Sequence, residues 1–291
     1  MTTIWFGLSY GAIYSLIAIG FNVIITTSGI LNFALGATVM FSTFIAYETL
    51  SVMHIPIVFA IVICAIIGGA IGGLTECVAI WPLTLGHRWK GTHAELITTV
   101  GVATILAGAA GIKWGYNPLL VPFPGSQTTV LLLGGRIPPL GIVLIALAVF
   151  TGLGLHLWSQ RTRIGMACLA ASEDRHAAEL RGINVRRLVV GSFVAAGVLA
   201  GIVGILTAPL TYSLPTLGNT LTLSGFVALA LGGFGSYLGS IIGGLLIGVV
   251  ASLTARYLGA NYQQTIEFAL LLFILLVKPG GLLSQKELRH A

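Results

Sequence analysis

The sequence predicts an all-α polytopic membrane protein, and three observations support that prediction. Of the 291 residues, 56% are hydrophobic and only 8% are charged, whereas soluble domains carry roughly 25% charged residues. The mean hydropathy is +1.01. Uniformly apolar runs recur along the chain, each close to the roughly 20 residues that cross a bilayer as a helix. Strands of an outer-membrane barrel would instead alternate apolar and polar residues, so the pattern excludes a barrel.

About eight apolar runs are long enough to be membrane spans. The first run has neither a basic leading segment nor a cleavage site, so we expect a retained span and not a removable signal peptide. Glycine is abundant, at 39 residues, which suits helices that approach one another closely in lipid. The predicted spans are residues 4–27, 31–52, 55–81, 94–113, 138–158, 189–209, 223–256 and 263–278.

Basic residues between the spans determine the expected orientation. They are concentrated in residues 85–93, in residues 161–187 and in the tail from Lys278 onward. Because cytoplasmic loops carry the excess of lysine and arginine, these three segments are expected in the cytoplasm, with the uncharged N-terminus outside. The same loops account for the net charge of +6, so no nucleic-acid partner is expected.

Two helix breaks are predicted inside the apolar runs. The chain must return to the outer side before its last span, so residues 223–256 cannot be a single crossing. Their glycines favour a hairpin, with a half-helix at 223–231 and a longer helix from about 239. Whether this hairpin is re-entrant or crosses twice is left open by the sequence. A second break is predicted within residues 26–36; transporters often have such breaks near the substrate path, although the two halves here show no convincing sequence repeat.

Polar and small residues at the two breaks are candidates for a translocation pathway. Exposed backbone together with amide and hydroxyl groups could hold the ammonium and carboxylate groups of a zwitterion. The alternative is that small and hydroxyl residues mediate contacts between helices. The candidates are Ser28, Gly29, Asn32, Gly36, Asn219, Thr222, Ser224 and Gly225.

The stretch 161–187 is the most polar part of the chain. It contains 9 of the 22 charged residues (14 Lys+Arg plus 8 Asp+Glu). Within it, SEDRHAAELRG predicts one short helix, capped by Ser172 and ended by the left-handed residue Gly182. Ala177, Ala178 and Leu180 would form its small apolar contact surface. A solvated loop that touches lipid phosphates is the simpler alternative, but an ordered, capped helix is typical of an element that docks into a partner protein.

Six motifs follow one another along the chain: GLSYGAIYSLIAIGFNVI, SGILNFALGA, ELITTVGVATIL, RTRIGMACLAASEDRHAAELRGINV, GGFGSYLGSIIGGLLIG and LLLFILLVKPGGLL. Together they resemble the permease subunits of ABC importers of the branched-chain amino-acid type (LivH type). The resemblance covers almost the whole chain. The sequence departs from it at Leu35, where many relatives have a histidine, and at Leu169, where many have an arginine.

The resemblance implies an ABC importer permease fold and a function as a multi-pass permease subunit in the bacterial cytoplasmic (inner) membrane. One transmembrane domain would cover residues 1–291, with a cytoplasmic coupling loop at 159–188. The implied partners are a second related permease, two ATP-binding-cassette ATPase subunits and a periplasmic or extracellular substrate-binding protein. The expected coupling residues are Arg163, Gly165, Ala170, Glu173, Asp174, Ala177 and Gly182.

The chain itself is not expected to be an enzyme or to hold a cofactor. A P-loop requires a lysine directly after a glycine, and none of the four lysines meets this requirement. ATP and Mg²⁺ would therefore be bound by the partner ATPases. The histidines and cysteines do not fall at metal-ligand spacing, so no metal site is expected.

An ion-coupled secondary transporter is the main alternative function. Functional acids inside a membrane are costly and therefore informative. Four glutamates lie near predicted span ends and are more readily explained as interfacial or paired residues: Glu48, Glu76, Glu95 and Glu267. Within the importer class, branched-chain amino acids are the default substrate, with urea or small carboxylic acids as alternatives.

Overall fold

The computed structural model describes residues 1–85, 94–123, 130–132, 134–278 and 280–283. Within them, eight helices are long and apolar enough to cross a membrane. Residues 86–93 of the predicted basic segment 85–93, and the tail beyond 283, lie outside the described residues. The helices are α1 Thr2–Ser28, α2 Ala34–Tyr47, α3 Ile57–Thr75, α4 Trp81–Leu85, α5 Ala94–Trp114, α6 Pro139–Arg161, α7 Arg163–Glu173, α8 Arg175–Leu180, α9 Val185–Thr211, α10 Leu217–Gly232, α11 Tyr237–Tyr257 and α12 Gln263–Val277.

Short irregular elements extend the long helices. A π-helical turn, Glu48–Val52, follows α2, and a second, Glu76–Ile80, joins α3 to α4. A 3₁₀ turn, Ala260–Tyr262, precedes α12. Two short strands, β1 Val130–Leu132 and β2 Gly135–Ile137, pair antiparallel. The sequence pattern does not predict this strand pair, because three-residue strands carry too little alternation to be detected.

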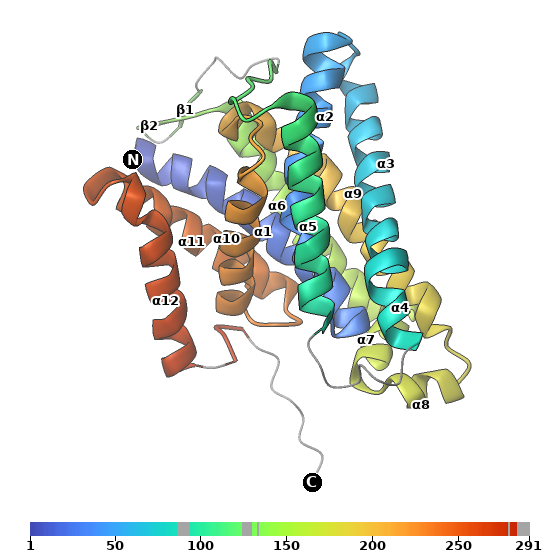
Figure 1. Cartoon of the computed structure of the whole chain (residues 1–291). Helices are drawn as coiled ribbons and strands as arrows, with labels where there is room; N and C mark the ends of the chain where they lie inside the picture. Colours follow the sequence, from blue (N-terminus) through green and yellow to red (C-terminus); the bar gives the residue numbers. More distant parts are fainter. Residues whose placement is uncertain (86–93, 124–129, 133, 279, 284–291) are drawn as a thin grey trace.

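The helices run between two ends of the molecule (Figure 1). One end carries the β1–β2 hairpin and the start of α1, and we call it the hairpin end. The opposite end carries α7, α8 and the last turn of α12, and we call it the loop end. The first and last described helices therefore begin and finish on opposite sides, in agreement with the predicted orientation. The eight apolar helices make the chain a multi-pass membrane protein.

The helical hairpin predicted at 223–256 is formed by α10 and α11 and crosses the bundle twice. Helix α10 begins at the hairpin end and finishes at the loop end, and α11 returns toward the hairpin end (Figure 1). Before α10, Ser213 forms a β-bridge with Leu119, and near its end the carbonyl of Leu231 accepts from the amide of Leu282 (2.7 Å). With 16 residues, α10 is about 24 Å long. The half-helix predicted at 223–231 is therefore shorter than α10, which already begins at Leu217. The residues before position 223 are helical as well, and there Gly218 packs closely against Ala37 of α2.

Two close helix pairs, each lined by glycines, form the centre of the fold. In the α1–α11 pair, a Cβ added at Gly248 would overlap Gly11. In the α3–α9 pair, a Cβ added at Gly72 would overlap the carbonyl of Phe193. Such small residues let helix backbones approach in lipid, where no hydrophobic effect drives helices together.

The order of these elements reveals an inverted structural repeat. Helices α1 and α9 each have 27 residues, each end at a break, and each lead into a helix of the centre, α2 and α10. The next helix of one half packs on the first helix of the other, so that α3 lies against α9 and α11 against α1. In Figure 1, α1 runs toward the loop end and α9 away from it. The fold is therefore repeated although the sequence shows no convincing repeat.

Candidate translocation pathway and coupling site

The first break lies between α1 and α2, where the sequence predicts it. Gly29 takes a left-handed conformation (φ +70°), and its amide donates to the carbonyl of Ile25. The Oδ1 atom of Asn32 accepts from the amide of Ala34 (3.0 Å) and so satisfies the start of α2. Ser28 donates to the carbonyl of Ile24 (2.8 Å), and its hydroxyl accepts from the amide of Ile30 (3.2 Å) beyond the helix end. These polar side chains mainly satisfy backbone groups that the break would leave unpaired.

The next two pathway candidates form the crossing of α2 and α10. A Cβ at Gly36 would overlap Oγ1 of Thr222, so the two helices are in backbone contact here. The Thr222 hydroxyl lies 2.8 Å from the carbonyl of Gly218 and 3.3 Å from that of Phe33. Gly36 and Thr222 thus connect the first break to α10 and are buried between helices.

The remaining candidates on α10 face three different directions. Ser224 donates to Oε2 of Glu267 on α12 (2.7 Å), and Gly225 packs against Ile17 of α1. Asn219 is exposed. The eight candidates therefore do not line one continuous surface, and their role in a pathway stays a prediction.

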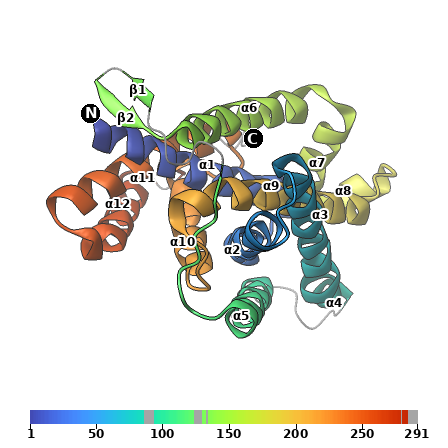
Figure 2. The ribbon, with the colours of Figure 1, turned by 90° about the horizontal axis from the view of Figure 1, so that it is seen from above.

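One face of α10 is left uncovered by the rest of the chain. Thr216 and Asn219 are exposed, and Leu223 and Phe226 are partly exposed. Their spacing of three and four residues places them on one side of the helix. Figure 2 shows α10 between α12 and α5, with this part of the bundle open to the outside. This face is the natural surface of α10 for a second chain or for a pathway.

A series of aromatic rings connects the two breaks. The ring centroid of Phe33 lies 6.3 Å from that of Phe21 and 5.7 Å from that of Phe226. Phe226 in turn lies 6.5 Å from Phe234 in the α10–α11 turn. Sequence reasoning missed these residues, because isolated phenylalanines in apolar runs give no signal of their own.

Asn22 joins α1 to the α10–α11 turn and was also missed. It is fully buried. Its Nδ2 donates to the carbonyl of Ser236 (3.0 Å) and to Oγ of Ser240 (2.7 Å), and its Oδ1 accepts from the amide of Gly235 (2.8 Å). A lone asparagine deep inside a 27-residue apolar helix is the signal that could have revealed it.

Replacement of Asn22 by alanine is expected to loosen this connection. Asn22→Ala leaves the Gly235 amide and the Ser236 carbonyl without these partners, which should destabilise the protein by about 2 kcal/mol. Thermal unfolding of the purified protein in detergent measures the effect. Asn219→Ala, at an exposed position of α10, is the control. Equal unfolding temperatures for the two variants would contradict the role of Asn22.

The coupling stretch contains two helices, not one. Asp174 caps α8, because its Oδ1 accepts from the amide of Ala177 (3.0 Å). The predicted cap was wrong: Ser172 lies inside α7, and its hydroxyl donates to the carbonyl of Leu169 (2.8 Å). Helix α7 extends back to Arg163 because its buried face packs beneath α1, which the charge pattern does not show.

Helix α8 is presented almost entirely to the surroundings. Ala178 is its single buried residue, and Leu180 is 78% exposed, so Leu180 does not share the contact of Ala178 with the bundle. Gly182 ends the helix in a left-handed conformation (φ +80°), as predicted. In Figures 1 and 2, α8 projects beyond the ends of the neighbouring helices.

Most of the predicted coupling residues are accessible for docking. Gly165 differs, because it is buried in the turn between α6 and α7, where a Cβ would overlap the carbonyl of Trp158. Thr162 caps α7 at the same turn by accepting from the Gly165 amide (3.0 Å). Gly165 is therefore placed to hold α7 in position. The exposed members of the set are Arg163, Ala170, Glu173, Asp174, Ala177 and Gly182.

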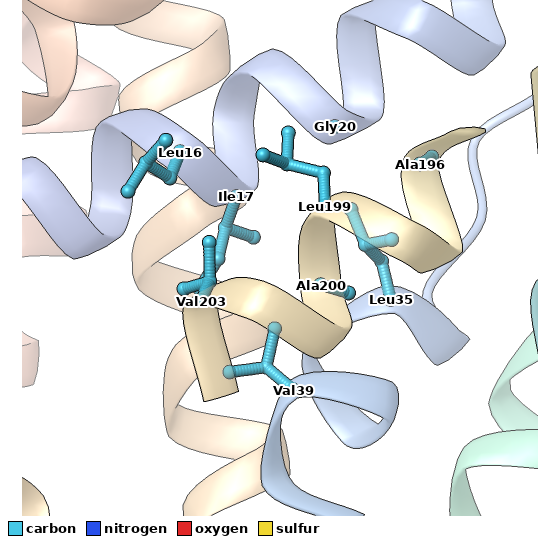
Figure 3. A pocket seen from close by; sticks show the side chains of 9 residues that line it. All are labelled: Leu16, Ile17, Gly20, Leu35, Val39, Ala196, Leu199, Ala200 and Val203. Carbon is cyan, nitrogen blue, oxygen red and sulfur yellow. The ribbon is translucent and has the colours of Figure 1, made fainter. Parts of the chain in front are cut away.

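The position of Leu35 is apolar throughout. Figure 3 shows its side chain beside a narrow cavity between α1, α2 and α9, together with Ile17 and Val203. Leu35 is 2% exposed, and a Cβ on Gly20 would lie 2.7 Å from its Cδ2. Leucine fills this space through contacts with apolar neighbours.

A bundle with an inverted repeat, broken helices and the projecting helix α8 defines the class: a membrane transport permease. Residues 3–275 match the family described as "Branched-chain amino acid transport system / permease component", and the chain belongs to this family. It is a permease subunit of an ABC importer, a class that works with ATPase subunits and a substrate-binding protein.

Full-length relatives and a solved structure agree with this assignment. The chain is 30% identical to the high-affinity branched-chain amino acid permease protein BraD of Pseudomonas aeruginosa, over 97% of this chain and 94% of that protein. It is also 30% identical to LivH of Salmonella typhimurium, with the same coverage. The solved structure of PsaBC from Streptococcus pneumoniae in complex with Fab covers 96% of this chain and 93% of its own, with a TM-score of 0.52 and 10% identity, and supports the fold alone.

Proposed function

We propose that this subunit carries branched-chain amino acids inward across the bacterial cytoplasmic (inner) membrane. It would form half of the pathway beside a second related permease, which contacts the open face of α10. Two ATPase subunits would bind ATP and Mg²⁺ at the loop end, and an external substrate-binding protein would deliver the substrate at the hairpin end. The single observation that carries the proposal is α8, a capped helix that projects from the bundle and is buried only at Ala178.

The contacts of the loop end supply a rigid route from α8 to the breaks. Helix α8 follows α7 directly, and α7 packs against α1. Cys168 of α7 is 7% exposed beside Thr27 of α1, and burial raises the pKa of its thiol, so the contact stays uncharged. Asn22 then ties α1 to the α10–α11 turn. Movement of α8 by the ATPases would therefore shift α1 and α10 together.

Two of the four acids, Glu267 and Glu48, support this reading over an ion-coupled transporter. A third, Glu76, is buried, and its Oε2 has no hydrogen-bond partner among the described residues. Glu267 accepts from Ser224 (2.7 Å) and from Nε2 of Gln263 (3.3 Å), so it joins α10 to α12. Glu48 accepts from Nε1 of Trp114 (2.8 Å) and lies 4.0 Å from Nζ of Lys113. Both acids are engaged in contacts between helices, as expected for structural acids in a membrane.

Transport by the complete complex in proteoliposomes tests the proposal. With the partner ATPases, the second permease and the binding protein present, we expect uptake of leucine, isoleucine and valine that requires ATP. Binding protein loaded with leucine should also stimulate ATP hydrolysis. Parallel assays with urea and with a small carboxylic acid separate the alternative substrates. Leucine uptake that persists without ATP and follows a proton gradient would overturn the proposal.

A further inference from the structure

A second, larger cavity lies near the loop end, apart from the breaks. It lies where α6 and α9 diverge, since these two helices barely touch, and it has a volume of about 460 Å³. Helix α7 forms one wall, and α1 and α11 form the floor. The lining consists of Val23, Thr27, Leu155, Trp158, Ile164, Cys168, Arg187, Leu188, Gly191, Ser192, Ala195 and Tyr237.

The chemistry of this cavity is divided between its walls and its rim. The walls are mainly apolar, with Leu155, Ile164 and Leu188 among them. Arg187 lines the cavity in the first turn of α9 and is exposed, and its amide donates to Oδ1 of Asn184 (3.1 Å). The cavity thus combines an apolar interior with a cationic rim.

The depth of the cavity matches one region of the bilayer. It spans the last turns of α6 and the first turns of α9, both at the loop end. Trp158 belongs to its lining and is 38% exposed, which is typical of aromatic residues at a membrane–water interface. An occupant at this depth meets hydrocarbon on one side and polar headgroups on the other.

We propose that this cavity binds an anionic phospholipid from the leaflet at the loop end. One acyl chain lies between α6 and α9, and the headgroup phosphate is bound by Arg187. A zwitterionic amino acid fits the site less well, because the mostly apolar lining supplies no carboxylate for an ammonium group. Because Ile164 and Cys168 of α7 form one wall, the bound lipid braces α7 beneath α1. Coupling through α8 then depends on lipid charge, a property beyond the transport function itself.

Filling the cavity tests the site directly. A Cβ at Gly191 meets nothing within 4 Å, so Gly191→Phe can enter the cavity without a clash at its base. Gly154 on α6 has the same open surroundings but does not line the cavity, which makes Gly154→Phe the matched control. Native mass spectrometry of the complete complex, purified from nanodiscs that contain phosphatidylglycerol, measures the lipid retained. We expect Gly191→Phe to lose one bound phosphatidylglycerol and Gly154→Phe to keep it.

The charge of the rim is tested in the same preparation. Arg187→Gln should weaken phosphatidylglycerol retention by about fivefold, and Arg187→Lys should restore most of it. Phosphatidylcholine should be retained poorly by all variants. Stimulated ATP hydrolysis should also be higher in phosphatidylglycerol than in phosphatidylcholine nanodiscs, and Gly191→Phe should remove this difference. Equal retention by Gly191→Phe and Gly154→Phe, or equal retention of the two lipids by the unmodified protein, would overturn the proposal.

Discussion

Ala177→Trp is expected to reduce ATP-driven uptake strongly while the protein still inserts and folds. Ala177 is exposed on α8, and its amide binds the capping carboxylate of Asp174. An indole at this position would separate α8 from any groove that receives it. A misfit at the centre of an interface costs on the order of 2 kcal/mol or more, so we expect uptake to fall by about thirtyfold or more. Radiolabelled leucine uptake into proteoliposomes containing the complete complex is the measurement.

The control places the same change on a surface that faces lipid. Ala70 is exposed on α3, and Ala70→Trp should leave uptake nearly unchanged. Unfolding temperature and basal ATP hydrolysis should remain near the unmodified values for both variants. If Ala177→Trp transports as well as Ala70→Trp, α8 is not the coupling element.

Gly248→Leu is expected to destabilise the bundle more than any other change considered for these helices. Even a Cβ at this position overlaps the backbone of Gly11 and Gly7, and backbone cannot move aside as a flexible side chain can. Helices α1 and α11 would have to separate along their length. We expect a loss of about 3 kcal/mol or more, seen as a lower unfolding temperature and a smaller monodisperse fraction in gel filtration.

Gly101→Leu on α5 provides the comparison, because a Cβ there meets nothing within 4 Å. Leucine favours a helix more than glycine does, so this variant should be at least as stable as the unmodified protein. A Gly248→Leu variant that unfolds at the temperature of Gly101→Leu would show that the α1–α11 contact is looser than described. The abundance of tagged variants in the membrane fraction gives a second readout if Gly248→Leu cannot be purified.

The membrane spans and both breaks could be predicted from the sequence, because lipid imposes simple constraints on a chain. The length of each apolar run defines the spans. Because the chain must return to the outer side before its last span, a turn was required near Gly233, and the structure contains it. The extent of α10 could not be predicted in the same way. Its first turn contains Gly218 and Asn219 and packs against α2 where Gly218 approaches Ala37, which is a tertiary contact without a local signal.

The candidate site was predictable only in its outline. The end of α8 at Gly182 follows from local rules of helix termination, and the structure bears it out. The capping residue does not follow, since serine and aspartate serve equally well and burial of α7 decided between them. The role of Asn22 depends on three groups more than 200 residues away in the chain. Such partners are defined by the fold and cannot be read from neighbouring residues.

The two glycine-lined helix pairs also explain why an inverted repeat can persist without a visible trace in the sequence. At positions such as Gly72 and Gly248, one added methyl group already overlaps the backbone of the neighbouring helix. Random substitutions at these positions would therefore disrupt the helix contact and be lost by selection. Exposed residues such as Ile112 and Leu276 face lipid, where one apolar side chain replaces another at little cost. Two halves descended from a common ancestor would therefore diverge over most of their surface while a few sites of contact preserve the shared architecture.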